Sequence, residues 1–195
     1  MQTIAIIGSG NVGTALASRL QQAGYHVTFG GREPGVTEAA TRDAAIVLVA
    51  VPAAAAVDAL RAGGDLTGKI IVDCTNPLRW ENGPVWAPPS EGSMSHALAA
   101  ALPGARVVKG FNHFGAEVQA NPQTKSGPVE AFFASDDADA KASVMTLARA
   151  MGFEPKDAGP LRNAAALENM AVLWIHLATV GGAGRQFAFQ MVGCE

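Results

Sequence analysis

The chain has 195 residues, of which 49% are hydrophobic and 16% are charged, and its formal net charge is −3. This length fits one domain, or one domain with a small appendage, and an acidic balance without basic runs argues against nucleic acid as a partner. Because the charged fraction lies well below the roughly 25% usual for soluble domains, we expect a second subunit to cover part of the apolar surface, as in a homodimer.

Neither a membrane segment nor a secretory leader is predicted. The longest apolar stretch, 44–57, is interrupted by Pro52 and is shorter than the roughly 18 residues that a membrane helix needs. The first strand begins at once, without a basic leader. Cys74 and Cys194 lie far apart and lack CxxC spacing, so we expect a reduced, cytoplasmic protein without membrane contact.

An apolar strand expected at 3–7 runs into a glycine-rich loop, which is followed by a helix expected at 14–23. In this G-x-G-x-x-G loop, Gly8 permits a tight turn, Gly10 lets the backbone approach a phosphate, and Gly13 lets helix and strand pack closely. The helix N-terminus adds free N–H groups and the positive end of its dipole. The loop in this context predicts a binding site for the pyrophosphate of a dinucleotide.

The second strand, expected at 25–29, is followed by Gly30, Gly31 and Arg32. An NAD site places Asp or Glu near this point, where the carboxylate binds the ribose 2′-OH. Here the glycines leave room for a phosphate and the guanidinium offers it a planar set of donors, so the predicted cofactor is NADP(H). Glu33 is the alternative: turned inward, it would restore an NAD-type contact, but its place past the strand end favours a solvated carboxylate.

Strands and helices continue to alternate, which predicts an α/β fold of the Rossmann type: a doubly wound, mostly parallel sheet with a C-terminal helical segment. Further strands are expected at 45–51, 69–73, 106–111, 129–134 and 153–155, and further helices at 37–42, 52–60, 93–102 and 137–151, the last after a Ser135-Asp136 cap. The segment 74–92, rich in Pro, Gly and Trp, is too long for a plain connection and is expected to be a functional loop.

The last predicted element, 161–180, is one long helix that is apolar over most of its circumference. Arg162, Asn169 and His176 form a narrow polar stripe at seven-residue steps. Such a helix needs partners on two sides, and we expect these to be the chain's own sheet and a second subunit. The chain is thus expected to consist of a Rossmann domain, 1–158, and a C-terminal helix and tail, 159–195, that contribute to the substrate pocket and the dimer contact.

Six blocks of residues occur in a fixed order: 8–13, 31–32, 49–52, 73–78, 107–112, and 159–161 with 167–168. With these blocks the chain resembles the coenzyme F420-dependent NADP oxidoreductases, which exchange hydride between NADPH and the deazaflavin F420. It is also similar to the NADP-binding reductase domain of the metalloreductases. The likeness covers nearly the whole chain, and six ordered blocks are far more specific than the glycine motif alone.

The site residues that this resemblance implies lie at the carboxyl ends of the predicted strands, where open parallel sheets bind ligands. They are Ser9, Asn11 and Val12 with the three glycines at the pyrophosphate, Gly31 and Arg32 at the 2′-phosphate, Ala50, Val51 and Pro52 at the ribose, and Asn76 and Pro77 at the nicotinamide. Asn112 and His113 are implied to face the nicotinamide ring and are the candidate catalytic residues.

Three functions remain open at this point. Hydride transfer to a deazaflavin or flavin needs alignment and exclusion of water more than side-chain chemistry. Reduction of a small carbonyl or imine would also require a proton donor, for which His113 or Lys109 is the candidate. The third function is non-catalytic NADP sensing. No metal site is predicted, because no cluster of His, Cys and Asp has ligand spacing.

Several of these residues also have a purely structural interpretation. Lys109 is expected to point across a strand end towards solvent, and His113 to hydrogen-bond the backbone if it does not act on substrate. His96 is expected to be a surface or helix-packing residue, and His176 to make a subunit or substrate contact. Trp174 is expected in the core or in a dimer interface, and Cys74 in the core. Trp80 and Trp86 are expected to form a lid or to pack within their loop.

Overall fold

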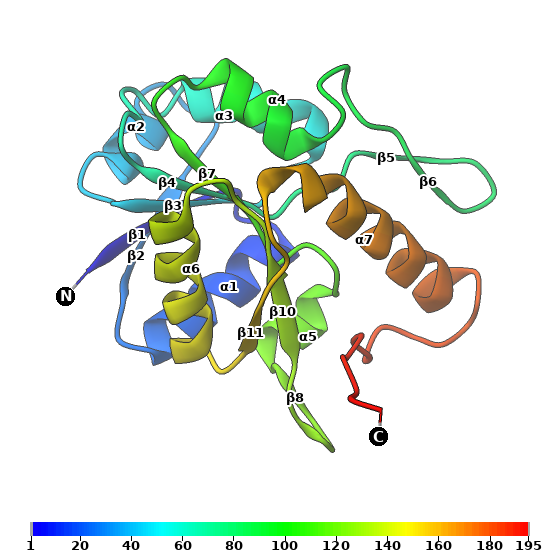
Figure 1. Ribbon diagram of the computed structural model, residues 1–195. Helices are drawn as coiled ribbons and strands as arrows, with labels where there is room; N and C mark the ends of the chain where they lie inside the picture. The colour runs from blue at the N-terminus through cyan, green and yellow to red at the C-terminus, as the bar shows by residue number, and fades with distance from the viewer. Residues whose placement is uncertain (1, 195) are drawn as a thin grey trace.

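The computed structural model of the protein, which describes residues 2–194, is built around a five-stranded parallel sheet (Figure 1). The strand order is β2-β1-β3-β4-β7. The strands are β1 (Thr3–Ile7), β2 (His26–Gly30), β3 (Ile46–Val49), β4 (Ile70–Asp73) and β7 (Arg106–Lys109). Their pairings are all parallel, so the predicted Rossmann-type sheet is confirmed.

Alternate side chains of each strand enter two separate cores, one on each face of the sheet. Ile4 and Ile6 pack with α1 (Asn11–Gln22) and α6 (Ala138–Ala150) on one face. Ala5 and Ile7 belong to the core on the other face, which is covered by α3 (Ala56–Arg61) and α4 (Met94–Ala101). The central strands β3 and β4 are buried along their whole length, which explains their nearly continuous apolar sequence.

Each predicted helix is present with shifts at its ends, and one helix, α5 (Ala116–Ala120), was not predicted. The helix α1 begins at Asn11, three residues earlier than expected, and is followed at Gly24 by a glycine with φ 86°, the left-handed conformation expected of a C-terminal cap. The predicted cap of α6 is wrong: the side chain of Asp137, not Ser135-Asp136, accepts the N–H of Ala140 at 2.9 Å. The shorter elements are α2 (Val36–Thr41), η1 (Ala53–Ala55) and α5 (Ala116–Ala120).

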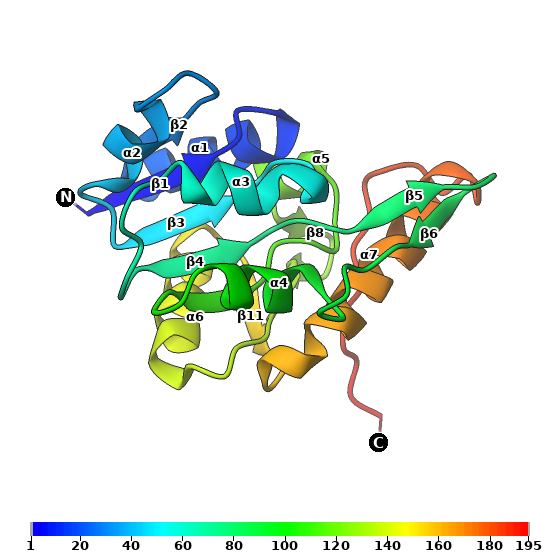
Figure 2. The same ribbon diagram turned by 90° about the horizontal axis from the view of Figure 1, so that it is seen from above.

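The expected irregular loop 74–92 contains a β-hairpin of two three-residue strands, β5 (Leu78–Trp80) and β6 (Pro84–Trp86). This hairpin extends away from the sheet and lies along the C-terminal helix (Figure 2). A second hairpin that was not predicted joins β8 (Gln123–Thr124) to β9 (Gly127–Pro128). Strands this short, interrupted by Pro and Gly, have no periodic pattern that could predict them.

Two further strands, β10 (Glu130–Phe133) and β11 (Glu154–Asp157), form a parallel pair beside the main sheet. An antiparallel bridge between Lys109 and Ala134 joins this pair to the end of β7. The extended sheet is therefore mostly parallel, as predicted.

The predicted helix 161–180 consists of a short 3-10 turn, η2 (Leu161–Asn163), followed by α7 (Ala164–Thr179). One face of α7 packs on the domain through Leu167 and Trp174, whereas Leu173 remains 51% exposed. The residues after α7 form a tail without regular secondary structure that returns past α5 towards the β8–β9 hairpin (Figure 1).

Candidate functional site

The glycine loop lies where the strand order reverses. The chain passes from β1 to β2 on one side and from β3 to β4 on the other. The loops after β1 and β3 therefore diverge and leave a crevice between them. Gly8 has φ 113°, and a Cβ there would lie 2.5 Å from the carbonyl oxygen of Ala50. A Cβ on Gly13 would collide with the carbonyl oxygen of Gly8, whereas a Cβ on Gly10 would meet open space. This geometry matches the predicted division of roles among the three glycines.

The first turn of α1 borders this crevice. Its N-cap is Gly10, and no side chain caps the helix there. The backbone N–H groups of Asn11, Val12 and Gly13 therefore lack intrahelical acceptors. Free N–H groups at a helix N-terminus, next to open space at Gly10, form a site suited to an anion such as a pyrophosphate.

A cavity of about 610 Å³ extends from the glycine loop to the tip of β2. It contains most of the implied cofactor residues: Gly8, Ser9, Gly10, Gly31, Arg32, Ala50, Val51 and Pro52. Glu33 is exposed and is not among the residues that line the cavity. Arg32 at the tip of β2 thus lines the cavity, whereas Glu33, the alternative NAD-type contact, does not.

Two asparagines join the ends of β4 and β7. The side chain of Asn76 donates to the carbonyl oxygen of Asn112 at 2.7 Å, and the side chain of Asn112 donates back to Asn76 Oδ1 at 2.8 Å. Asn112 Nδ2 also donates to the carbonyl oxygen of Leu167 at 2.9 Å, which connects the pair to α7. We call Asn76 and Asn112 the amide pair. Neither it nor the buried Pro77 lines the 610 Å³ cavity, so their contact with a nicotinamide stays a prediction.

The backbone before Asn112 is held in an unusual conformation. Phe111 has φ 54°, a left-handed value that is rare for a bulky residue. Its carbonyl oxygen accepts a hydrogen bond from Gln119 Nε2 at 3.1 Å, and its ring packs edge-on against Phe133 and Phe153. These contacts fix the direction in which the chain leaves β7 and therefore the position of Asn112.

The imidazole of His113 lies beside the amide pair, with Nδ1 3.4 Å from Asn112 Oδ1, and its implied contact with the nicotinamide stays a prediction. Its side chain is completely buried, next to Phe114 and Phe132, and Nε2 lies 3.4 Å from the carbonyl oxygen of Glu130. Burial lowers the pKa of His113 to about 4, so the imidazole is neutral near pH 7. A buried neutral imidazole is a poor proton donor, and its contact with the backbone of Glu130 agrees with the structural interpretation.

The expectation that Lys109 points towards solvent is wrong. Its side chain is completely buried, and Nζ donates to Asp73 Oδ2 at 3.0 Å, to Glu168 Oε1 at 3.1 Å and to the carbonyl oxygen of Thr75 at 2.6 Å. Asp73 and Lys109 occupy paired positions at the ends of β4 and β7, and Glu168 approaches from α7. We call Asp73, Lys109 and Glu168 the anionic cluster.

The other contacts of this cluster also come from hydrogen-bond donors. Asp73 Oδ1 accepts the backbone N–H of Thr75 at 2.9 Å and its hydroxyl at 2.7 Å, and Asp73 Oδ2 accepts the hydroxyl of Ser95 at 2.7 Å. Glu168 accepts the N–H of Met94 at 2.9 Å and the indole N–H of Trp86 at 3.0 Å. Both carboxyl groups are thus surrounded by hydrogen-bond donors, an arrangement that suits carboxylates.

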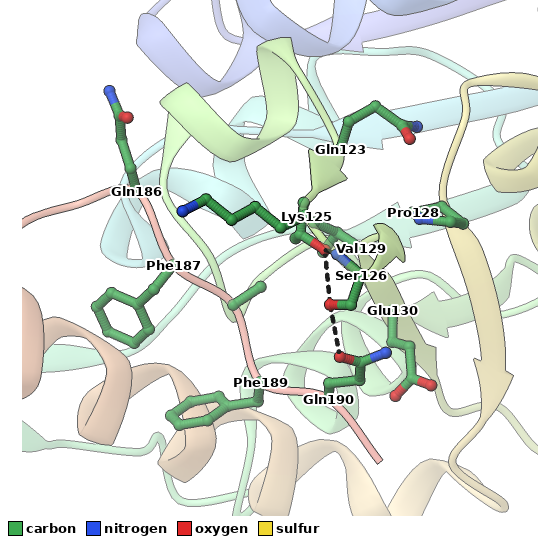
Figure 3. Close-up of a pocket in the computed structure, with 12 residues that line it drawn as sticks. Gln123, Lys125, Ser126, Pro128, Val129, Glu130, Gln186, Phe187, Phe189 and Gln190 are labelled. Carbon is green, nitrogen blue, oxygen red and sulfur yellow. Dashed lines mark hydrogen bonds between the residues drawn. The ribbon is translucent and has the colours of Figure 1, made fainter. Parts of the chain in front are cut away.

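A second cavity, of about 660 Å³, lies between the β8–β9 hairpin and the tail. Figure 3 shows it between Phe187 and Phe189 of the tail and the hairpin residues Lys125 and Pro128, with a hydrogen bond from Ser126 to Gln190 that joins the hairpin to the tail. Other lining residues include Gln123, Val129, Glu130 and Gln186. We call this cavity the tail pocket. Among the described residues that line it, Lys125 is the only cation.

The tail is attached mainly through Trp174, which is 3% exposed. The indole N–H donates to the carbonyl oxygen of Phe187 at 2.8 Å, and the two rings stack with 5.3 Å between centroids. Arg185 lies over the indole ring and pairs with Glu117 of α5 at 2.7 Å. Of the two interpretations of Trp174, the structure supports packing within the chain.

The remaining candidates occupy minor positions. His96 Nδ1 lies 2.8 Å from the hydroxyl of Ser93 at the start of α4, and His176 is exposed on α7. Cys74 is buried, and burial raises the pKa of its thiol, so it is an unreactive core residue. Trp80 is 58% exposed on the hairpin, whereas Trp86 contributes to the anionic cluster.

One feature of the sequence could have indicated this cluster: charged residues at the ends of two apolar strands. β4 and β7 are short apolar runs that end in Asp73 and Lys109, which have opposite charges at neighbouring strand ends. Glu168 is a single carboxylate on the buried face of α7. Opposite charges at the ends of adjacent buried strands predict a pair, because a lone buried charge would be strongly unfavourable.

Comparisons with known proteins agree with the fold and the glycine loop. Residues 3–39 match the sequence model of a family described as NADP oxidoreductase, coenzyme F420-dependent. The chain is 32% identical to metalloreductase STEAP3 of Rattus norvegicus over 179 residues, which are 85% of this chain and 35% of that protein. It is equally identical to the human metalloreductase STEAP2 over 182 residues. The chain thus spans about a third of the length of these metalloreductases.

Among solved structures, a candidate F420-dependent NADP reductase from Arthrobacter superposes with a TM-score of 0.88 at 29% identity, covering 97% of this chain and 99% of that one. A hypothetical protein from Sinorhizobium meliloti is 30% identical, with a TM-score of 0.67 over 83% of this chain and 86% of that one. A reductive aminase from Aspergillus terreus, solved with NADPH, shares the fold at 22% identity and a TM-score of 0.68. The predicted family resemblance and the predicted cofactor, NADP(H), are confirmed by these relations.

Within residues 2–194 no helix has the length and apolar character to cross a membrane. In the same part of the chain no three His, Cys, Asp or Glu side chains are grouped so that they could hold a metal ion.

Proposed function

We propose that the protein transfers hydride between NADPH and a deazaflavin or flavin acceptor, because residues 3–39 match the sequence model of a family described as NADP oxidoreductase, coenzyme F420-dependent. The observation that carries this proposal is the crevice at β1 and β3, which combines open space at Gly10, the uncapped N-terminus of α1 and the cation of Arg32. These features fit a dinucleotide with an additional phosphate.

In this proposal the 610 Å³ cavity holds the phosphate half of the cofactor. The N–H groups at the start of α1, with Ser9, bind the pyrophosphate, while Gly31 and Arg32 bind the 2′-phosphate. The wall formed by Ala50, Val51 and Pro52 contacts the ribose next to the nicotinamide. The amide pair and Pro77 border the nicotinamide. Residues 1–158 act as the cofactor-binding unit, and residues 159–195 close the acceptor side.

When bound, NADPH supplies the hydride, and the acceptor ring gains it together with one proton from water. The protein has to align the two rings and exclude water from the space between them, while the acceptor's protonated atom stays accessible to water. The mutual hydrogen bonds of Asn76 and Asn112 fix the wall beside the nicotinamide. The contact of Asn112 with Leu167 ties that wall to α7, which together with the β5–β6 hairpin shields the site.

The acceptor is proposed to enter from the side of α7 and the tail. Glu130, which lines the tail pocket, contacts His113 through its carbonyl oxygen, and His113 directly follows the amide pair residue Asn112. The tail pocket is therefore close to the proposed nicotinamide position. Its two phenylalanines and its amide side chains suit a planar heterocycle, and Lys125 offers one cation to an anionic group of the acceptor.

A deazaflavin or flavin acceptor is favoured over a carbonyl or imine, because neither candidate proton donor, His113 or Lys109, is placed to give up a proton. His113 is buried and neutral, with a pKa lowered to about 4 by burial, and Lys109 is enclosed between two carboxylates. Reduction of a carbonyl or imine needs a proton donor at the reacting atom, whereas a deazaflavin or flavin can take its proton from water.

A panel of acceptors tests this function. Rapid mixing of the protein and NADPH with F420, FMN, FAD, a ferric chelate or a cyclic imine should give saturable NADPH oxidation with F420 or a flavin. Oxidation by the imine alone would contradict the proposal and favour an imine reductase. Tight NADPH binding without oxidation by any of the five acceptors would contradict it in favour of a sensor.

We also propose that the protein is a homodimer through apolar side chains exposed on α7 and on the adjoining β5–β6 hairpin. Leu173 and Val180 are each 51% exposed, and Trp80 is 58% exposed. Sedimentation at micromolar concentration should show a dimer, and Leu173→Asp should shift it to a monomer because burying a carboxylate in the interface is unfavourable. The control Val36→Asp changes a similarly exposed residue, 39%, on α2, and should remain dimeric. A monomeric wild-type protein would contradict the proposal.

A further inference from the structure

We infer that the buried anionic cluster of Asp73, Lys109 and Glu168 favours the oxidised, positively charged nicotinamide over the reduced, neutral one, and so adapts the protein to use NADPH as a hydride donor. This inference rests on the proposed function, because it requires the nicotinamide to bind beside the amide pair. It assigns a role to three residues that do not line the cofactor cavity.

The first step is the charge of the cluster. Asp73 and Glu168 each accept hydrogen bonds from several donors, and Lys109 Nζ contacts both carboxylates, at 3.0 and 3.1 Å. Two carboxylates and one ammonium leave one negative charge in excess. The N–H of Met94 at the start of α4 contributes only the partial positive charge of a helix terminus. The cluster therefore remains negative overall.

The second step is its position. Asp73 and Lys109 each lie three residues before a member of the amide pair, Asn76 and Asn112. Glu168 directly follows Leu167, whose carbonyl oxygen accepts the Asn112 side chain. Lys109 Nζ also donates to the carbonyl oxygen of Thr75 at 2.6 Å, so the cluster directly supports the loop that carries Asn76. The excess charge thus lies behind the wall proposed to border the nicotinamide.

The third step is the effect of burial. The side chains of all three cluster residues are completely buried, so mobile ions screen their field much less than that of surface charges. The nicotinamide ring gains one positive charge when it loses hydride. By Coulomb's law, a unit negative charge about 10 Å from a unit cation, at an effective dielectric constant of about 20, changes a binding constant by roughly an order of magnitude. A smaller change, about threefold, follows if water enters between them.

The test compares the affinities for NADP⁺ and NADPH in the same protein. In Glu168→Gln, and separately in Asp73→Asn, the affinity for NADP⁺ should fall about three- to tenfold relative to the affinity for NADPH. The matched control is Trp86→Phe, which removes the hydrogen bond to Glu168 Oε2 without changing the charge of the cluster. Its ratio of the two affinities should equal that of the wild type. Ligand titration gives both constants without any turnover.

An unchanged ratio in both neutralised variants would overturn the inference, as would an equal change in Trp86→Phe. If neither neutralised variant folds, the wild type still provides a test: NADP⁺ should bind at least as tightly as NADPH, and much tighter binding of NADPH would overturn the inference. A wild-type protein that binds neither nucleotide would instead overturn the proposed function on which the inference rests.

Discussion

Replacing Lys109 with methionine is expected to lower the free energy of unfolding by about 3–5 kcal/mol, because the substitution leaves two buried carboxylates without their cation. Methionine has a similar length and fills the space of the lysine stem, so loss of packing is a minor contribution. Lys109 also connects three elements, β4, β7 and α7, through Asp73, Thr75 and Glu168. Urea denaturation, followed by far-ultraviolet circular dichroism, measures the change directly.

The control is Lys156→Met. Lys156 also contacts two carboxylates, Glu130 at 3.3 Å and Glu154 at 3.6 Å, but its side chain is 33% exposed. The expected loss is smaller than for Lys109→Met, because Lys156 and Glu154 are partly exposed and Glu130, although buried, keeps the N–H of Met191 as a donor. Adding Asp73→Asn and Glu168→Gln to Lys109→Met should restore part of the lost stability, because no unpaired charge then remains. A Lys109→Met protein as stable as the wild type would show that the cluster is not ionised as described.

The parts of the site that the sequence predicted are those set by local backbone geometry. Gly8 and Gly13 have to be glycines because a Cβ on Gly8 would meet the backbone of Ala50 and a Cβ on Gly13 would meet the backbone of Gly8. Such close contacts recur wherever a strand, a glycine loop and a helix follow one another. The place of Arg32 in the cavity was likewise predicted from its position at the tip of the second strand. A linear pattern is sufficient for these residues, because each acts near its own strand end.

The parts that the sequence did not predict depend on segments distant in the chain. Lys109 was assigned to solvent because a lysine after an apolar strand is usually exposed. Its burial depends on Asp73, 36 residues away, and on Glu168, 59 residues away. His113 is likewise buried by Phe132 and by the backbone of Glu130. The opposite charges at the ends of β4 and β7 indicate the pair of Asp73 and Lys109 only once the two strands are known to be neighbours, and no local pattern indicates Glu168 or the partners of His113.

The same distinction applies to the fold. The strands of the main sheet were predicted because buried parallel strands are continuous apolar runs between glycines and helices. The β5–β6 hairpin was not, because its three-residue strands are stabilised by packing against α7 and have no alternating pattern of their own. The tail is similar: Phe187 is fixed by its stacking on Trp174, a contact that only the folded chain creates.

Replacing Arg32 with alanine is expected to weaken NADPH binding roughly ten- to hundredfold while leaving NADH binding nearly unchanged, because a charge-assisted hydrogen bond to a phosphate contributes about 1.5–3 kcal/mol. Arg32 lines the cavity beside Gly31, and NADH lacks the 2′-phosphate that the guanidinium would bind. Isothermal titration with each nucleotide measures both affinities.

Glu33→Ala is the matched control for Arg32→Ala, since Glu33 is the neighbouring exposed charge and does not line the cavity. NADPH binding should not weaken in this variant, because removing a carboxylate near a phosphate can only reduce repulsion. Equal losses of NADPH and NADH in Arg32→Ala would show that the arginine supports the loop and does not recognise the 2′-phosphate. A large loss of NADH binding in Glu33→Ala would show that the carboxylate turns inward to the ribose. The two variants therefore show which of the two neighbouring charges at the tip of β2 recognises the ribose of the cofactor.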